Sequence, residues 1–206
     1  MERNWAGNHA YRARALHRPG TLEELQELIA RTPRIRVLGT RHSFNAIADS
    51  EELVSLERLP GAVTVGDATI TCPAHMTYGA LAGELEPHGL ALANLASLPH
   101  ISVAGSVATA THGSGDRNGN LATAVAGLEL VTSDGELRSV RRGDPEFEGH
   151  VVSLGALGAL TRIELDVEPY YEIRQRVFEG LGWDDLLAHF DAVFASAYSV
   201  SAFSRW

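Results

Sequence analysis

Residues 36–45 read Arg36-Val37-Leu38-Gly39-Thr40-Arg41-His42-Ser43-Phe44-Asn45, a hydrophobic strand that runs directly into a tight polar loop. Glycine in such a loop lets the backbone approach a ligand closely, and a neutral imidazole beside it offers a nucleophile near physiological pH. Read alone, the same pattern describes an ordinary surface turn with an exposed histidine. The function of this stretch therefore depends on a second loop farther along the chain.

The second loop spans residues 94–115 and is rich in small and hydroxyl-bearing side chains. Its sequence is Asn94-Leu95-Ala96-Ser97-Leu98-Pro99-His100-Ile101-Ser102-Val103-Ala104-Gly105-Ser106-Val107-Ala108-Thr109-Ala110-Thr111-His112-Gly113-Ser114-Gly115. Successive backbone N–H groups and hydroxyls form concave anion sites, and a helix that starts near Gly105 would add its positive end. The alternative is a surface loop in which small residues serve as turn formers. The dinucleotide fingerprint is absent, because the glycines that follow Gly113 miss its third glycine by one place.

Alternating helix and strand patterns surround these loops and predict an α+β protein. Capping patterns at Thr21 and Thr77 begin two helices. Gly66-Asp67 and Ser133-Asp134-Gly135 are typical of hairpin turns. Helices are expected at 22–32 and 78–86, and strands at 34–38, 53–56, 62–65, 68–72, 90–93, 128–132, 137–141 and 161–167.

The composition changes after Pro169, where aromatic side chains become frequent. We expect a main domain at 1–169, with subdomains of about 1–60 and 61–169. Residues 170–206 would begin a second domain, with one amphipathic helix over 183–196. About 37 residues rarely form an independent core, so this segment is not expected to fold as a separate unit.

Charge and composition exclude several classes of protein. The formal net charge of −9 disfavours a polyanion-binding surface, so no nucleic acid partner is expected. The chain has no lysine, which excludes a P-loop lysine, a pyridoxal Schiff base and a Ser-Lys dyad. Cys72 is the only cysteine, so neither an intrachain disulfide nor a cysteine zinc cluster can form.

No apolar run approaches the ~20 residues of a membrane span, and the N-terminus lacks a signal-peptide pattern. We therefore expect a cytoplasmic, monomeric protein without a membrane partner. No metal is expected, because the remaining histidines lack metal-ligand spacing and are read as structural or exposed. These histidines are His9, His17, His75, His88, His150 and His189, whereas for His100 and His112 a role in the second loop stays open.

Three motifs together resemble a known family. They are Leu38-Gly39-Thr40-Arg41-His42-Ser43-Phe44-Asn45, Ser97-Leu98-Pro99-His100-Ile101-Ser102-Val103-Ala104-Gly105-Ser106 and Thr111-His112-Gly113-Ser114-Gly115. The chain resembles the FAD-binding (PCMH-type) domain of the vanillyl-alcohol-oxidase superfamily, and within it the alditol (xylitol) oxidases. The resemblance extends from Asn4-Trp5-Ala6-Gly7-Asn8 through Ser153-Leu154-Gly155-Ala156-Leu157-Gly158 to Ala197-Tyr198-Ser199-Val200-Ser201.

The resemblance implies two α+β subdomains with FAD bound between them. Residues 1–169 would be the FAD-binding domain, and 170–206 would be the start of a truncated substrate (cap) domain. The residues implied to surround the pyrophosphate are Val37, Leu38, Gly39, Thr40, Arg41, His42 and Ser43, with His42 bonded covalently to the C8 methyl group of the flavin. Those implied to hold the phosphate and ribityl portion are Ser102, Gly105, Ser106, Val107, Ala108 and His112.

Two further contacts follow from the same resemblance. Leu160 would contact the adenine side through its backbone, and Ser97 would lie beside the flavin ring, facing the substrate. Arg41 stands where many superfamily members have glycine. No cysteine lies near residues 96–111, so the resemblance implies one covalent bond to the flavin rather than two.

The implied reaction is oxidation of the terminal primary alcohol of a polyol such as xylitol or sorbitol to an aldose, with O2 reduced to hydrogen peroxide. In this family the acid, arginine and lysine that activate the alcohol come from the second domain, so the catalytic residues are unknown here. We expect weak or no oxidase activity from these residues alone. Two alternatives stay open: a sugar-1,4-lactone oxidase of the same superfamily, and a non-catalytic flavin carrier or interaction module that uses the aromatic tail.

Overall fold

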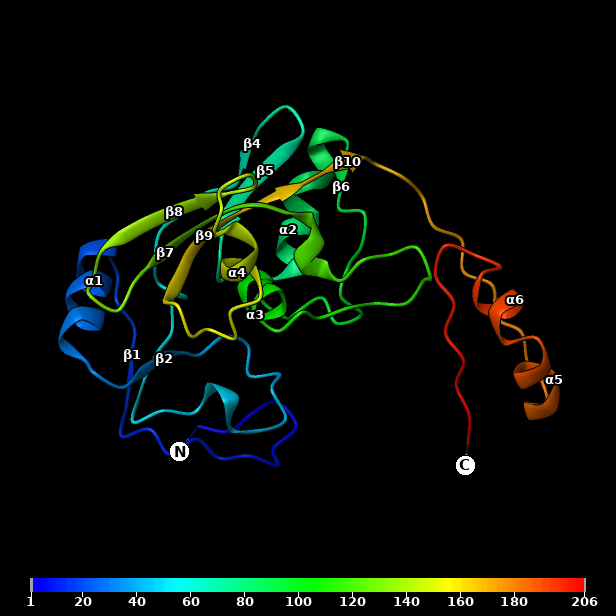
Figure 1. Ribbon diagram of the computed structural model, residues 1–206, viewed down its shortest axis with the longest axis horizontal. Coiled ribbons are helices and arrows are strands. Elements are labelled where there is room, and N and C mark those ends of the chain that lie inside the picture. Colours follow the sequence, from blue (N-terminus) through cyan, green and yellow to red (C-terminus); the bar gives the residue numbers. More distant parts are fainter. Residues whose placement is uncertain (1, 206) are drawn as a thin grey trace.

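Two sheets of different type organise the chain in the computed structural model, which describes residues 2–205 (Figure 1). The smaller sheet is parallel and has the order β1-β3-β2, formed by Ala15–His17, Glu52–Val54 and Ile35–Val37. The larger sheet is antiparallel and has the order β4-β5-β9-β7-β8, formed by Thr64–Val65, Thr69–Pro73, Ala159–Asp166, Val125–Val131 and Leu137–Arg141. A short pair joins β6 (Leu90–Ala91) to β10 (Glu168–Pro169). The α+β class expected from the sequence is confirmed.

The helices are short and lie between strands in the chain. They are α1 (Leu22–Arg31), α2 (Tyr78–Leu85), α3 (Val103–Ala108), α4 (Phe147–Val151), α5 (Trp183–Ala188) and α6 (Phe190–Phe194), with 3-10 turns η1 (Ala46–Ala48), η2 (Glu86–His88) and η3 (Leu121–Ala124). Both capping predictions are confirmed: the hydroxyl of Thr21 accepts from the backbone N–H of Glu24, and that of Thr77 accepts from Ala80.

The main core lies between the larger sheet and the helices α2 and α3. Ile70 and Ile163 from the sheet are fully buried there with Leu81 of α2 and Val107 of α3. A second cluster joins the two sheets, because Leu25 of α1 packs with Val54 of the smaller sheet and Val131 of the larger one. Burial of each of these side chains stabilises the fold by about 1.5–3 kcal/mol.

The predicted hairpins form as expected, although β7 begins at Val125, three residues before the predicted start. The expected subdomain boundary near residue 60 falls between β3 and β4, the last strand of one sheet and the first of the other. The domain division itself stays a prediction.

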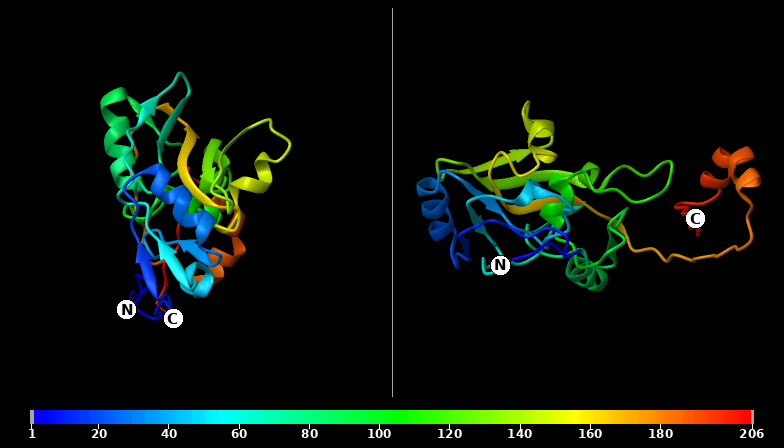
Figure 2. Two further views of the ribbon diagram at one scale, coloured as in Figure 1. Left: turned by 90° about the vertical axis from the view of Figure 1, so that its left-hand side faces the viewer. Right: turned by 90° about the horizontal axis from the view of Figure 1, so that it is seen from below.

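The tail after β10 differs from what the sequence predicts. Two short helices, α5 and α6, replace the single helix expected over 183–196, and they lie apart from the sheets at the end of an extended segment (Figures 1 and 2). The break is at His189, whose φ of −123° and ψ of 26° are not helical. Leu186 is the only described residue of these two helices that is buried. A single long helix has no apolar surface to pack against here, and short helices are marginal without such packing.

None of the helices that the structure describes between residues 2 and 205 is both long and apolar enough to cross a membrane.

Candidate functional site

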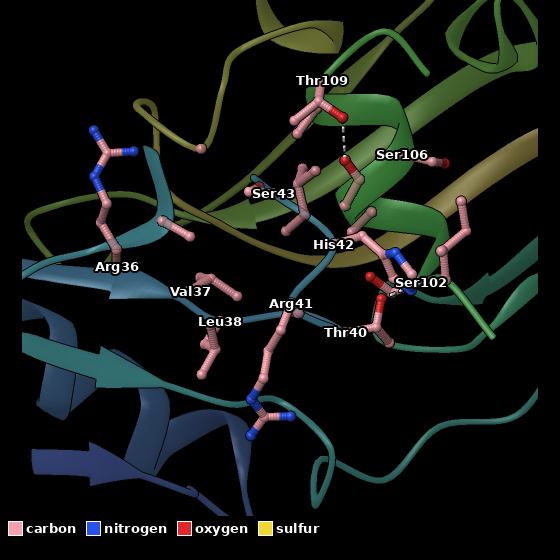
Figure 3. Close-up of a pocket in the computed structure, with 18 of the residues that line it drawn as sticks. Arg36, Val37, Leu38, Thr40, Arg41, His42, Ser43, Ser102, Ser106 and Thr109 are labelled. Atoms are coloured by element: carbon pink, nitrogen blue, oxygen red, sulfur yellow. Dashed lines mark hydrogen bonds between the residues drawn. The ribbon is translucent and has the colours of Figure 1, made fainter. Parts of the chain in front are cut away.

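A cavity of about 550 Å³ lies beside the first loop, where β2 ends and the chain passes α3 (Figure 3). The two polar loops singled out in the sequence supply much of its lining. Of the residues expected to bind a cofactor, those that line it are Val37, Leu38, Gly39, Thr40, Arg41, His42, Ser43, Ser102, Gly105, Ser106, Ala108 and Leu160. The volume is within the range of small-molecule and cofactor sites.

The two loops touch at Ser102, the residue that precedes α3. The backbone N–H of Ser102 donates to the hydroxyl oxygen of Thr40 at 3.2 Å. A Cβ atom added to Gly39 would lie 2.9 Å from the Ser102 hydroxyl, and one added to Gly105 would lie 2.8 Å from it. Both glycines therefore leave room for this hydroxyl between the loops, and a side chain at either position would have to displace it.

The first loop presents a run of unpaired backbone donors. Within residues 2–205, no atom accepts a hydrogen bond from the backbone N–H groups of residues 39–43. The strand ends just before them, because Leu38 still donates to the carbonyl of Val54 at 2.8 Å. Buried or half-buried backbone donors are nearly always satisfied, and successive free N–H groups form an anion-binding concavity. These donors suit the phosphate oxygens of a nucleotide cofactor.

His42 lies in this loop between two other aromatic rings. Its Nε2 is 2.7 Å from Nε2 of His100, and its ring stacks on that of Trp5 with centroids 4.9 Å apart. Burial lowers the pKa of His42, and the neighbouring His100 lowers it further. Both effects favour the neutral imidazole, which is the nucleophilic form.

Arg41 has a left-handed backbone, with φ of +67°. Its carbonyl accepts from the N–H of Trp5 at 2.8 Å, and its guanidinium forms an ion pair with Glu2 at 3.1 Å. The conformation is the one that glycine adopts at low cost, so Arg41 holds a strained backbone here.

We expect Arg41→Gly to leave the free energy of unfolding within about 1 kcal/mol of the wild type, because relief of backbone strain offsets loss of an exposed ion pair. Arg41→Val keeps the strain, adds a β-branched side chain and loses the ion pair, so it should destabilise by about 2 kcal/mol. Urea denaturation of both variants measures the difference. Equal stability of the two variants would contradict this account of the loop.

Three predicted residues do not line the cavity. Val107 is fully buried in the main core, so its side chain faces away from the site. His112 is exposed, with Nδ1 3.1 Å from the carbonyl of Gly113, and Ser97 is exposed as well. The roles given to these three residues stay predictions.

The cavity also includes residues that sequence reasoning missed. Ser55 and Glu57 follow β3, and His75 follows β5. His75 was read as structural or exposed, yet it is half-buried in the lining, and burial lowers its pKa. The parallel pairing of β2 with β3 places the carboxyl ends of both strands side by side, which brings Ser55 and Glu57 next to the first loop. The sequence predicted both strands but not their pairing.

Residues after α4 complete the lining. Leu154, Gly155 and Gly158 lie in the connection to β9. Leu154 is held from two sides, because its N–H donates to the carbonyl of Ala108 at 3.0 Å and its carbonyl accepts from the Arg36 guanidinium at 3.1 Å. This connection therefore ties the end of α3 to the strand that enters the first loop. Among the side chains described, no group of three or more His, Cys, Asp or Glu residues is placed to hold a metal ion.

Comparison with known proteins agrees with this geometry. Residues 13–141 match the family described as "FAD binding domain". Alditol oxidase from a Streptomyces species is 47% identical over 209 residues, covering 98% of this chain and 50% of the relative. L-Gulono-1,4-lactone dehydrogenase from Mycobacterium tuberculosis is 33% identical over 179 residues, covering 84% of this chain and 42% of the relative. The chain thus spans about half the length of the curated relatives it matches.

Solved structures support the fold. Two structures of cholesterol oxidase from Brevibacterium sterolicum superpose with TM-scores of 0.68 and 0.67, at 22% and 21% sequence identity. They cover 75% and 81% of this chain, and 34% and 36% of their own chains are matched.

Proposed function

The chain belongs to the FAD binding domain family, and on that premise we propose that it is the flavin-binding part of an alditol oxidase. The proposed reaction converts the terminal primary alcohol of a polyol such as xylitol or sorbitol to an aldose and reduces O2 to hydrogen peroxide. The single observation that carries flavin binding is the run of unpaired N–H groups at residues 39–43 along a cavity of suitable size. The assignment to alditols rests on the 47% identity over nearly the whole chain.

The residues of the two loops would hold the cofactor in this proposal. The N–H groups of residues 39–43 would donate to the pyrophosphate, and Ser102 and Gly105 would contact the phosphate and ribityl portion. Leu160 would contact the adenine side through its backbone, and Ser97 would face the substrate. When bound, FAD would supply the redox chemistry, which takes two electrons from the alcohol and passes them to oxygen.

We also propose that His42 attaches the flavin covalently. The support is local: His42 lines the cavity, and burial together with His100 lowers its pKa. A neutral imidazole is a competent nucleophile toward an electrophilic carbon. The attachment would prevent loss of the cofactor from the cavity.

A binding measurement tests the proposal. Titration of the chain with FAD should quench flavin fluorescence and saturate at one FAD per chain, because one cavity carries both loops. Gly39→Trp should abolish saturation, since its side chain must displace the Ser102 hydroxyl and fill the site. Gly83→Ala is the matched control, because an added Cβ there meets nothing within 4 Å in the middle of α2. Quenching that is equal in Gly39→Trp and wild type would contradict a site at these loops.

A second candidate is oxidation of sugar-1,4-lactones, which is favoured by the match to L-gulono-1,4-lactone dehydrogenase. Anaerobic addition of xylitol or of an aldonolactone to the FAD-loaded protein separates the two by which compound bleaches the flavin absorbance. If neither compound does so, the chain is a flavin carrier without oxidase activity, the outcome expected if alcohol activation needs a lysine that this sequence lacks.

The net charge of −9 supports the absence of a nucleic acid partner, and a monomeric, cytoplasmic protein without a membrane partner remains our expectation from composition.

A further inference from the structure

His42 and His100 lie ring against ring although they are 58 positions apart in the chain. Their Nε2 atoms are 2.7 Å apart and their ring centroids 4.6 Å apart. Trp5 stacks on His42 and lies 6.1 Å from His100, so both imidazoles are held in one aromatic group. His100 is outside the cavity lining, whereas His42 is part of it. The pair thus joins a residue of the cavity lining to an exposed residue outside the lining.

A contact of 2.7 Å between two imidazole nitrogens requires one of them to donate and the other to accept. When Nε2 of His42 donates to His100, Nδ1 of His42 carries the free lone pair. No atom of residues 2–205 forms a hydrogen bond with that Nδ1. Burial and the neighbouring His100 lower the pKa of His42, which favours the neutral ring that this arrangement needs. In this tautomer the nucleophilic nitrogen of His42 is Nδ1, which faces away from His100.

We propose that His100 is a positioning residue that orients His42 and accepts its Nε2 proton while His42 becomes covalently attached to FAD. This inference rests on the proposed covalent attachment at His42, and it names His100 as the residue that receives the proton released from His42. A neutral His42 that formed a bond at Nδ1 without losing its other proton would become a cation, and burial disfavours that charge. His100 is within direct hydrogen-bond reach to receive the proton.

The attachment balances with dioxygen as the oxidant. A bond forms between Nδ1 of His42 and the C8 methyl carbon of the flavin, that methyl group loses one proton, and His42 loses the other to His100. The two electrons released pass to dioxygen, which takes up both protons as hydrogen peroxide. The flavin ends in its original oxidation state, carrying one new C–N bond.

The experiment follows the rate at which flavin becomes acid-stable. Wild type, His100→Ala and His100→Gln are produced under riboflavin limitation and incubated with FAD in air. Samples are precipitated with acid at intervals, and the flavin in each pellet is measured. We expect both variants to attach FAD at least tenfold more slowly than wild type, since glutamine can keep a hydrogen bond to His42 but cannot accept a proton.

Free imidazole distinguishes a proton acceptor from a residue that only supports the local structure, because in the second case it would not change the attachment rate of His100→Ala. Added imidazole should restore attachment in His100→Ala, because it can occupy the vacated space and accept the proton. His88→Ala, which removes an exposed histidine outside the cavity lining, should attach at the wild-type rate. Fluorescence quenching before acid treatment verifies that each variant still binds FAD.

The possible failures are distinguishable. Wild-type rates in both His100 variants, or recovery in His100→Gln alone, would overturn the role of His100 as proton acceptor and leave covalent attachment intact. Absence of acid-stable flavin in wild type would overturn both proposals. Acid-stable flavin that persists in His42→Ala would show that attachment occurs elsewhere, which also removes the role given to His100.

Discussion

Replacement of His42 by alanine should remove all acid-stable flavin while leaving reversible FAD binding in place. The backbone donors of residues 39–43 do not depend on the imidazole, so the variant keeps the groups proposed to hold the pyrophosphate. The covalent bond, in contrast, is assigned to the imidazole in the first loop. The other imidazole of the lining, that of His75, follows β5, and the one cysteine, Cys72, is buried, which raises its pKa to about 12. Precipitation with acid should therefore leave the flavin colour in the supernatant for His42→Ala and in the pellet for wild type.

The matched control for this change is His88→Ala, which should keep the colour in the pellet. Its histidine is exposed, lies in η2 and is not part of the cavity lining. Retention of colour in the pellet by His42→Ala would contradict the assignment of His42. Complete loss of FAD binding by the same variant would instead mean that the imidazole, rather than the backbone, provides most of the binding energy.

Replacement of Gly158 by alanine should have the largest effect on stability. Gly158 has φ of +150° and precedes β9, and a Cβ atom there would lie 2.3 Å from the carbonyl oxygen of Val131. Val131 pairs with Ala159 at the end of β7, so the clash would have to separate the two central strands of the larger sheet. Backbone strain and lost pairing together should cost about 4 kcal/mol or more, a large part of the stability of a typical domain.

Gly155 provides a control three residues earlier in the same connection. It also has a positive φ, +68°, but an added Cβ meets nothing within 4 Å. Gly155→Ala should therefore cost only about 1 kcal/mol, from backbone conformation alone. Urea denaturation measures the free energy of unfolding of both variants. If Gly158→Ala does not fold, circular dichroism shows its loss of secondary structure instead. Similar losses in the two variants would show that the close approach to Val131 is not what requires glycine.

Local patterns in the sequence were sufficient for most of the fold. The caps at Thr21 and Thr77 and the turns at Gly66-Asp67 and Ser133-Asp134-Gly135 each act over a few residues, so the sequence states them directly. The tail was predicted less well. A helix pattern at 183–196 specifies one apolar side, but only a surface that packs against that side makes a single helix stable, and the sequence does not show whether one is present.

Part of the candidate site could also be predicted from the sequence, and part could not. The first loop is a continuous stretch, so its residues could be recognised from their order alone. The contact between Thr40 and Ser102, and the pairing of His42 with His100, depend on how β2 and α3 are placed in space. His75 was missed for the same reason, because it follows a strand of the other sheet.

Peptide mapping of the purified, FAD-loaded protein tests the central claim most directly. The chain has no lysine, so trypsin should release residues 42–58 as one peptide that begins with His42 and ends with Arg58. We expect mass spectrometry to find the flavin bonded to this peptide at His42. Flavin bonded to any other peptide, or an unmodified 42–58 peptide from protein whose FAD is entirely released by acid, would contradict it.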